Sequence, residues 1–130
     1  MRIVLSAILL AAVACAPTMG PGEPPQQPQG PGLVLPERLR AVGTEPFWAA
    51  LLAGTTLTYM TPEDQQGTPI AVRREEQDGA AVFHGKLAGT PLRLRIAAAT
   101  CSDGMSDTVY PYLAELTVGG QLRRGCARSD

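Results

Sequence analysis

The stretch Cys101-Ser-Asp-Gly-Met-Ser-Asp107 carries two hydroxyls and two side-chain carboxylates within one short segment. Such side chains bind a ligand when a scaffold holds them in place, or they bond to nearby amides in a turn, for which Ser, Asp and Gly are typical. Calcium usually takes about six to eight oxygen ligands, and Asp103 and Asp107 lack the spacing of a calcium-binding loop. We therefore take Ser102, Asp103, Ser106 and Asp107 as candidate binding residues and predict no metal.

No sequence signature of a common catalytic site occurs in the chain, neither His-Glu-x-x-His nor Gly-x-Ser-x-Gly nor Cys-x-x-Cys. His84 is the single histidine, and the sequence assigns it no orienting acid. A pair of acid and base carboxylates stays open as an alternative, because such pairing depends on the fold. We predict no catalytic residue, no cofactor and a non-enzymatic binding or structural module.

The first 14 residues have the pattern of a signal peptide: Arg2, an apolar run and a small residue at position 14. The run is shorter than the roughly 20 apolar residues of a membrane-spanning helix. Ala12-Val-Ala-Cys15 resembles the lipobox of bacterial lipoproteins, which implies that Cys15 carries lipid, palmitate included, and that its several acyl chains hold the protein on the membrane. An ordinary cleaved signal before a soluble periplasmic protein is the alternative. Ala16, where inner-membrane lipoproteins of enterobacteria have Asp, favours the outer membrane, facing the periplasm.

Two further cysteines remain once Cys15 is assigned to the lipid. An even pair in an oxidising compartment predicts a disulfide between Cys101 and Cys126. Closing a loop of this length stabilises a fold by roughly 3 kcal/mol. The alternative, a metal held by two thiolates, would need more Cys or His ligands than His84 provides.

The charge and the composition divide the rest of the chain. The net charge is −1, and no basic stripe indicates nucleic acid. Residues 15–36 are rich in Pro and Gly, which predicts a disordered tether after the lipidated cysteine. Residues 37–130 remain for one folded domain.

Short runs between closely spaced Gly and Pro residues predict strands in this domain. Pro91–Ile96 alternates between apolar and arginine side chains, and Tyr112–Val118 has a similar pattern. The segments 38–42 and 47–53 suit a helix equally well by composition, but Gly43 and Gly54 limit them to strand length. The sequence therefore predicts an all-β fold, a small antiparallel β-barrel of about seven or eight strands closed by one disulfide.

The Gly119-Gly120 junction allows two registers. A two-residue turn pairs Leu116 with Arg123 and places charge opposite the apolar face. A three-residue loop pairs Val118 with Leu122 and keeps apolar residues together, so we expect the three-residue loop.

Two longer motifs carry a resemblance to a known family. Gly43-Thr-Glu-Pro-Phe-Trp48 and the 101–107 stretch, with Tyr110 and Cys126, resemble the GTEPFW and CSDGMSD motifs of small, uncharacterised bacterial envelope lipoproteins. More loosely, the chain is similar to META-type domains and to membrane-bound inhibitors of c-type lysozyme, which are small β-barrels. The inhibitors use a short Ser- and Gly-containing loop, so the resemblance implies as an alternative function that the Ser102–Asp107 loop docks into such an enzyme.

The first motif adds candidates of its own. Phe47 and Trp48 are consecutive in a strand and must point to opposite faces. We expect one ring in the core and the other at an end of the barrel, and we take Glu45, Trp48 and Tyr110 as further candidate binding residues. The expected partners are the membrane, through the anchor, and an envelope protein or a lysozyme-like enzyme. The run Ala49–Leu52 departs from the alternating polar pattern of the family, so the sequence does not determine which face of this strand is buried.

Overall fold

The structure is a computed structural model that describes residues 32–130. The predicted signal peptide, Cys15 and most of the predicted tether lie outside the described residues. Nine strands follow one another along the chain: β1 (Arg38–Thr44), β2 (Phe47–Ala53), β3 (Thr56–Thr61), β4 (Asp64–Ala71), β5 (Arg73–Gln77), β6 (Ala80–Leu87), β7 (Thr90–Ser102), β8 (Val109–Val118) and β9 (Gln121–Ser129). Within residues 32–130 there is no helix with the length and apolar character needed to cross a membrane.

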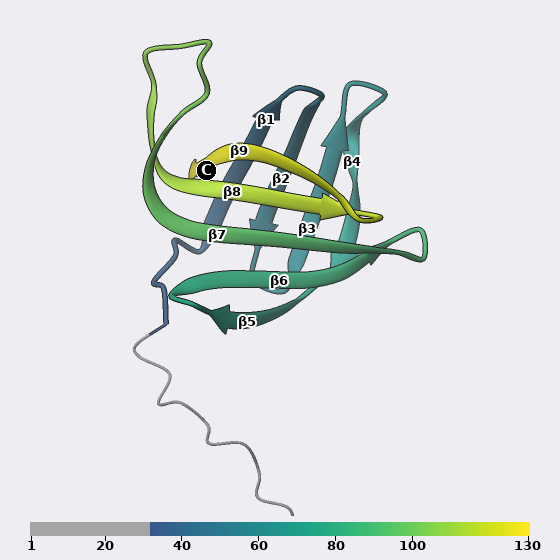
Figure 1. Cartoon of the computed structure of the whole chain (residues 1–130). Coiled ribbons are helices and arrows are strands. Elements are labelled where there is room, and N and C mark those ends of the chain that lie inside the picture. The colour runs from purple at the N-terminus through teal and green to yellow at the C-terminus, as the bar shows by residue number, and fades with distance from the viewer. Residues whose placement is uncertain (1–31) are drawn as a thin grey trace, which may run out of the picture.

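The strands form one antiparallel sheet in the order β4-β3-β2-β1-β9-β8-β7-β6-β5. The sheet curls into a half-barrel, with β1 to β4 crossing behind β5 to β9 (Figure 1). The all-β prediction is confirmed, with nine strands in place of seven or eight. The segments 38–42 and 47–53 are strands, as expected, although β1 continues through Gly43 to Thr44.

The two edges of the sheet are consecutive parts of the chain. β4 and β5 are separated only by Val72, whose amide donates a hydrogen bond to the carbonyl of Thr55 at 2.9 Å. β6 passes close to this corner: a Cβ atom added at Gly85 would lie 2.9 Å from the carbonyl oxygen of Ala71. A glycine is therefore needed there for the sheet to curl this tightly.

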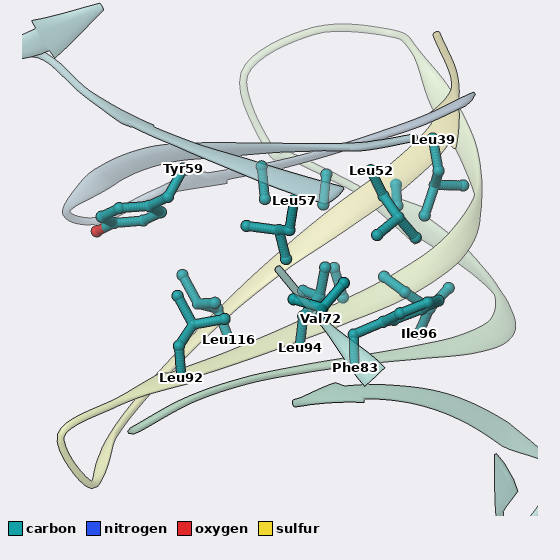
Figure 2. Packing of buried hydrophobic residues seen from close by; sticks show 14 of the residues in the cluster. Leu39, Leu52, Leu57, Tyr59, Val72, Phe83, Leu92, Leu94, Ile96 and Leu116 are labelled. Atoms are coloured by element: carbon teal, nitrogen blue, oxygen red, sulfur yellow. The ribbon is translucent and has the colours of Figure 1, made fainter. Parts of the chain in front are cut away.

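The core lies between the two halves of the curled sheet. Figure 2 shows side chains from β1, β2 and β3 facing side chains from β6, β7 and β8. A fully buried Leu or Ile contributes about 1.5–3 kcal/mol relative to an exposed one, so this double layer is the main stabilising element. Its larger members are Leu39, Trp48, Leu52, Leu57, Tyr59, Ile70, Phe83, Leu92, Leu94, Ile96 and Leu116.

The chain enters the fold through Leu33 and Leu35, which pack against the core. The amide of Leu33 donates to Oε2 of Glu76 at 3.1 Å, and the guanidinium of Arg74 donates to the carbonyl of Leu33. Contacts with the sheet thus begin a few residues before Glu37, where the sequence places the start of the domain.

The expected three-residue loop between β8 and β9 is wrong. Val118 pairs with Gln121 and Leu116 pairs with Arg123, so the turn has two residues. Gly119 and Gly120 have φ values of 56° and 82°, and positive φ at both central positions is what a type I′ hairpin turn requires.

Arg123, the charged residue that this register places opposite Leu116, has a hydrogen-bond partner on a distant strand. The guanidinium of Arg123 donates to the hydroxyl of Tyr59 at 2.7 Å. Leu122, which the expected register placed on the inner face, is 53% exposed. Turn chemistry and this hydrogen bond therefore outweigh the apolar pairing on which the prediction relied.

Candidate functional site: an apolar hollow at the loop end of the half-barrel

Three connections lie near one another at the same end of the half-barrel: the β1–β2 turn, the β3–β4 turn and the long β7–β8 loop (Figure 1). This end is called the loop end below. The three connections surround an open hollow of about 450 Å³. Its lining residues are Val42, Gly43, Thr44, Phe47, Trp48, Ala49, Met60, Thr61, Pro62, Gln65, Asp103 and Met105.

The floor of the hollow is a row of apolar residues across three strands. Val42 of β1 pairs with Ala49 of β2, which pairs with Met60 of β3. Side chains alternate between the two faces of a strand, and adjacent residues such as Ala41, Trp48 and Tyr59 are buried in the core. The row therefore lies on the outer face, where Phe47 adds a ring that is 55% exposed.

The two rings of the first motif have the opposite exposures that their spacing requires. Trp48 is only 3% exposed, whereas its neighbour Phe47 projects at the edge of the hollow. The indole packs against two glycines, where no side chain occupies the space. A Cβ atom added at Gly43 would lie 1.9 Å from Nε1 of Trp48, and one added at Gly125 would lie 3.0 Å from Cζ2 of Trp48. Trp48 thus supports the hollow from the core side.

The β7–β8 loop is held by the carboxylate of Asp103. Its Oδ1 accepts hydrogen bonds from the amides of Met105 and Ser106 at 2.9 and 3.0 Å. Its Oδ2 accepts from the hydroxyls of Ser106 and Tyr110 at 3.1 and 3.3 Å. The hydroxyl of Ser102 accepts from the amide of Gly104 at 3.2 Å. Most of the predicted polar site is therefore engaged in shaping the loop itself.

Two further contacts fix the base of the loop. Cys101 and Cys126 form the predicted disulfide, with Cα atoms 5.6 Å apart, which joins β7 to β9 across β8. Tyr110 is buried, and the guanidinium carbon of Arg128 lies 5.5 Å from the centre of its ring. The loop consequently projects from a cross-linked base (Figure 1).

The hydrogen bonds to Asp103 make the loop sensitive to acid. Those from the amides of Met105 and Ser106, then those from the hydroxyls of Ser106 and Tyr110, hold the pKa of the Asp103 carboxyl below its ordinary value of 3.8. A carboxyl with a lowered pKa stabilises the folded state above its unfolded pKa, and the stabilisation is lost as the pH falls through the folded pKa.

We expect the loop to stay ordered down to pH values below 3.8. The amide chemical shifts of Met105 and Ser106, followed by NMR, should titrate with a midpoint below that value. Tyr110→Phe removes one donor and should raise the midpoint. A wild-type midpoint at or above 3.8 would contradict this account of the loop.

The remaining sequence candidates lie around the hollow or away from it. Glu45 is exposed in the β1–β2 turn, and Asp107 is exposed in the β7–β8 loop. His84 lies on β6, where its Nε2 is 3.0 Å from Oε2 of Glu75, so its partner is a carboxylate of the neighbouring strand. Among residues 32–130 no three His, Cys, Asp or Glu side chains are grouped as a metal site would require.

Several apolar residues that the sequence did not single out as site residues line the hollow, among them Phe47, Met60 and Met105. Met105 carried a signal, because it is an apolar residue within an otherwise polar motif, and it is 68% exposed. Met60 is one apolar residue in an ordinary strand, and nothing local distinguishes it. Sequence reasoning favoured the polar residues of the loop, whereas the structure shows a mainly apolar surface that Asp103 lines on one side.

Comparisons with known proteins add no identification. A scan against models of protein families finds no match, and searches of curated proteins and of solved structures find no similar protein.

Proposed function

We propose that this protein is a membrane-anchored envelope lipoprotein that acts as a non-enzymatic binding module, with the loop-end hollow as its binding surface. The observation that carries the proposal is the apolar hollow of about 450 Å³ with the exposed side chains of Phe47 and Met105 at its edge. Binding sites are concave and mostly apolar with a few polar groups at their edges, and clustered exposed apolar side chains mark interaction surfaces.

The direction of the hollow supports the proposed anchor. Leu33 and Leu35 enter the fold at the start of β1, and β1 then runs to the loop end (Figure 1). A lipid on Cys15 would therefore attach the domain by the end opposite the hollow. The attachment would thus leave the hollow free, and a disordered tether over residues 15–36 would let an envelope partner reach it. The resemblance of the two long motifs to envelope lipoproteins supports the same assignment.

The binding surface can be tested with the neutral apolar dye N-phenylnaphthylamine. The full chain should bind the dye with increased fluorescence. Phe47→Ala combined with Met105→Ala should weaken the affinity about tenfold. A factor of ten corresponds to about 1.4 kcal/mol, and burial of one Phe or Met side chain contributes about that much or more. Leu122→Ala, at a similarly exposed apolar residue near the start of β9, is the matched control. Equal dye binding by the double variant and the wild type would contradict the proposal.

The alternative function is inhibition of a c-type lysozyme or a similar wall-cleaving enzyme through the Ser102–Asp107 loop. One observation favours it: the loop projects from the sheet on a cross-linked base and is held in shape by Asp103. The purified chain should then slow c-type lysozyme, and Ser102→Ala with Asp103→Ala should remove the effect. Unchanged lysozyme activity at micromolar excess of the chain would exclude this function.

A further inference from the structure

The connections that surround the hollow carry acidic side chains and no basic ones. Positions 43–48, 60–68 and 102–109 contain no Lys or Arg. Their carboxylates are Glu45, Glu63, Asp64, Asp103 and Asp107. The loop end therefore combines an apolar floor with a negatively charged rim, and like charges around a concave surface reinforce one another's field.

Two arginines lie near this end, and one of them, Arg124, lines a smaller neighbouring hollow together with Asp103. Nε of Arg124 lies 3.8 Å from Oε1 of Glu115, and the guanidinium of Arg128 stacks on Tyr110. Neither arginine lines the loop-end hollow. Of the five carboxylates Asp103 lines the hollow itself, and the other four lie on the connections around it.

This charge distribution decides among the occupants that an apolar hollow admits. A second copy of the chain, joined through the same surface, would bring two acidic rims together, which is unfavourable. An anionic lipid surface is repelled for the same reason. Residues 15–36 of the chain itself have Glu23 as their one charged side chain, so they offer nothing that complements the rim.

We propose that the hollow binds a basic protein segment, in which an apolar side chain is flanked by lysines or arginines. The inference rests on the proposed function and names the partner class of the same site. The apolar side chain lies on the row formed by Val42, Ala49 and Met60, beside the ring of Phe47. The flanking cations lie against the rim, where Glu45 and Glu63 are exposed.

Each part of this arrangement has a different role. Apolar contact with the floor supplies most of the affinity, because rim pairs between exposed charges contribute about 0–1 kcal/mol each. The rim supplies selection against neutral and acidic segments, together with a faster encounter that salt suppresses. Affinity should thus depend on Phe47, and the choice between partners should depend on the carboxylates.

Trp48 provides a direct readout. It is the single tryptophan of the chain and lines the hollow, so its emission reports occupancy when the added peptide contains no tryptophan. The test compares a short synthetic peptide, Leu-Phe flanked on both sides by lysines, with the same peptide flanked by glutamates. Both are titrated into the purified full chain at low and at high salt.

We expect the lysine peptide to change the Trp48 emission saturably and the glutamate peptide to bind at least about tenfold more weakly. Glu45→Gln with Glu63→Gln should weaken binding of the lysine peptide roughly fivefold at low salt, within the range of two exposed ion pairs, and less at high salt. Asp78→Asn, an exposed acidic position in the β5–β6 turn, is the matched control for charge. Its φ of 51° suits asparagine.

The outcomes separate this inference from the proposed function. Equal binding of the two peptides, or binding of N-phenylnaphthylamine with no binding of the lysine peptide, would overturn the basic partner and leave the hollow as a binding surface. If neither the peptides nor the dye binds, the proposed function is contradicted as well. Selective, salt-sensitive binding of the lysine peptide that is lost in Glu45→Gln with Glu63→Gln supports the inference.

Discussion

Replacing Trp48 by alanine should lower the free energy of unfolding by about 3–5 kcal/mol, the usual cost of truncating a buried aromatic side chain. The indole is 3% exposed and fills the space above Gly43 and Gly125. Since a domain of this size is typically stable by only about 5–15 kcal/mol, the variant should be close to unfolding. Urea denaturation followed by far-ultraviolet circular dichroism measures the loss without needing tryptophan fluorescence.

Phe47→Ala is the matched control, because it removes the adjacent ring at an exposed position. It should cost much less than Trp48→Ala, while weakening dye binding. Gly125→Ala tests the same packing from the other side, since the added Cβ would lie 2.0 Å from the carbonyl oxygen of Val42 and the backbone would have to shift. Similar stabilities of Trp48→Ala and Phe47→Ala would contradict the assignment of the two rings.

Removing the disulfide should lower the free energy of unfolding by about 3 kcal/mol. Cys101 and Cys126 are separated by 25 positions, and the chain-entropy model gives this magnitude for a loop of that length. The variant Cys101→Ala with Cys126→Ala is preferable to serine, because Cys126 is buried and a serine hydroxyl there would need a hydrogen-bond partner.

Reduction of the wild-type disulfide provides an independent comparison. The reduced wild type and the double alanine variant should show similar losses in urea denaturation, and amide exchange should accelerate most in the β7–β8 loop. A double variant as stable as the oxidised wild type would show that the rest of the fold already restrains the ends of β7 and β9.

Much of the fold is predictable because its signals are local. The alternation in Pro91–Ile96 marks a strand with one buried face, and Gly54 follows the end of a segment, 47–53, that would otherwise suit a helix. The disulfide follows from counting cysteines once Cys15 is assigned to the lipid. Closely spaced glycines and prolines leave only short runs between them, and an antiparallel all-β fold is the arrangement that fits such short runs.

The register at Gly119–Gly120 was not predictable from pairwise patterning. The observed pairing places Arg123 on the inner face, where its partner is Tyr59, 64 positions earlier in the chain. A hydrogen bond between such distant segments leaves no trace in the local sequence. The Gly-Gly turn preference was a local signal, and it predicted the turn better than the apolar pattern did.

The assignment of the site was limited by the same kind of ambiguity. β2 is apolar on both faces, so the sequence did not determine whether Phe47 or Trp48 is buried. The structure gives a reason for the two apolar faces, because one packs into the core and the other, with Phe47 and Ala49, lines the hollow. The polar residues of the β7–β8 loop were conspicuous in the sequence, but Asp103 and Ser106 bond to each other within the loop.

The most direct test of the central claim is to locate N-phenylnaphthylamine on the full chain by intermolecular nuclear Overhauser effects. We predict contacts from the dye to the ring of Phe47 and to the methyl groups of Met60 and Met105. Contacts confined to Leu122, to Leu35 at the opposite end, or to no defined set of residues would contradict a binding surface at the loop end.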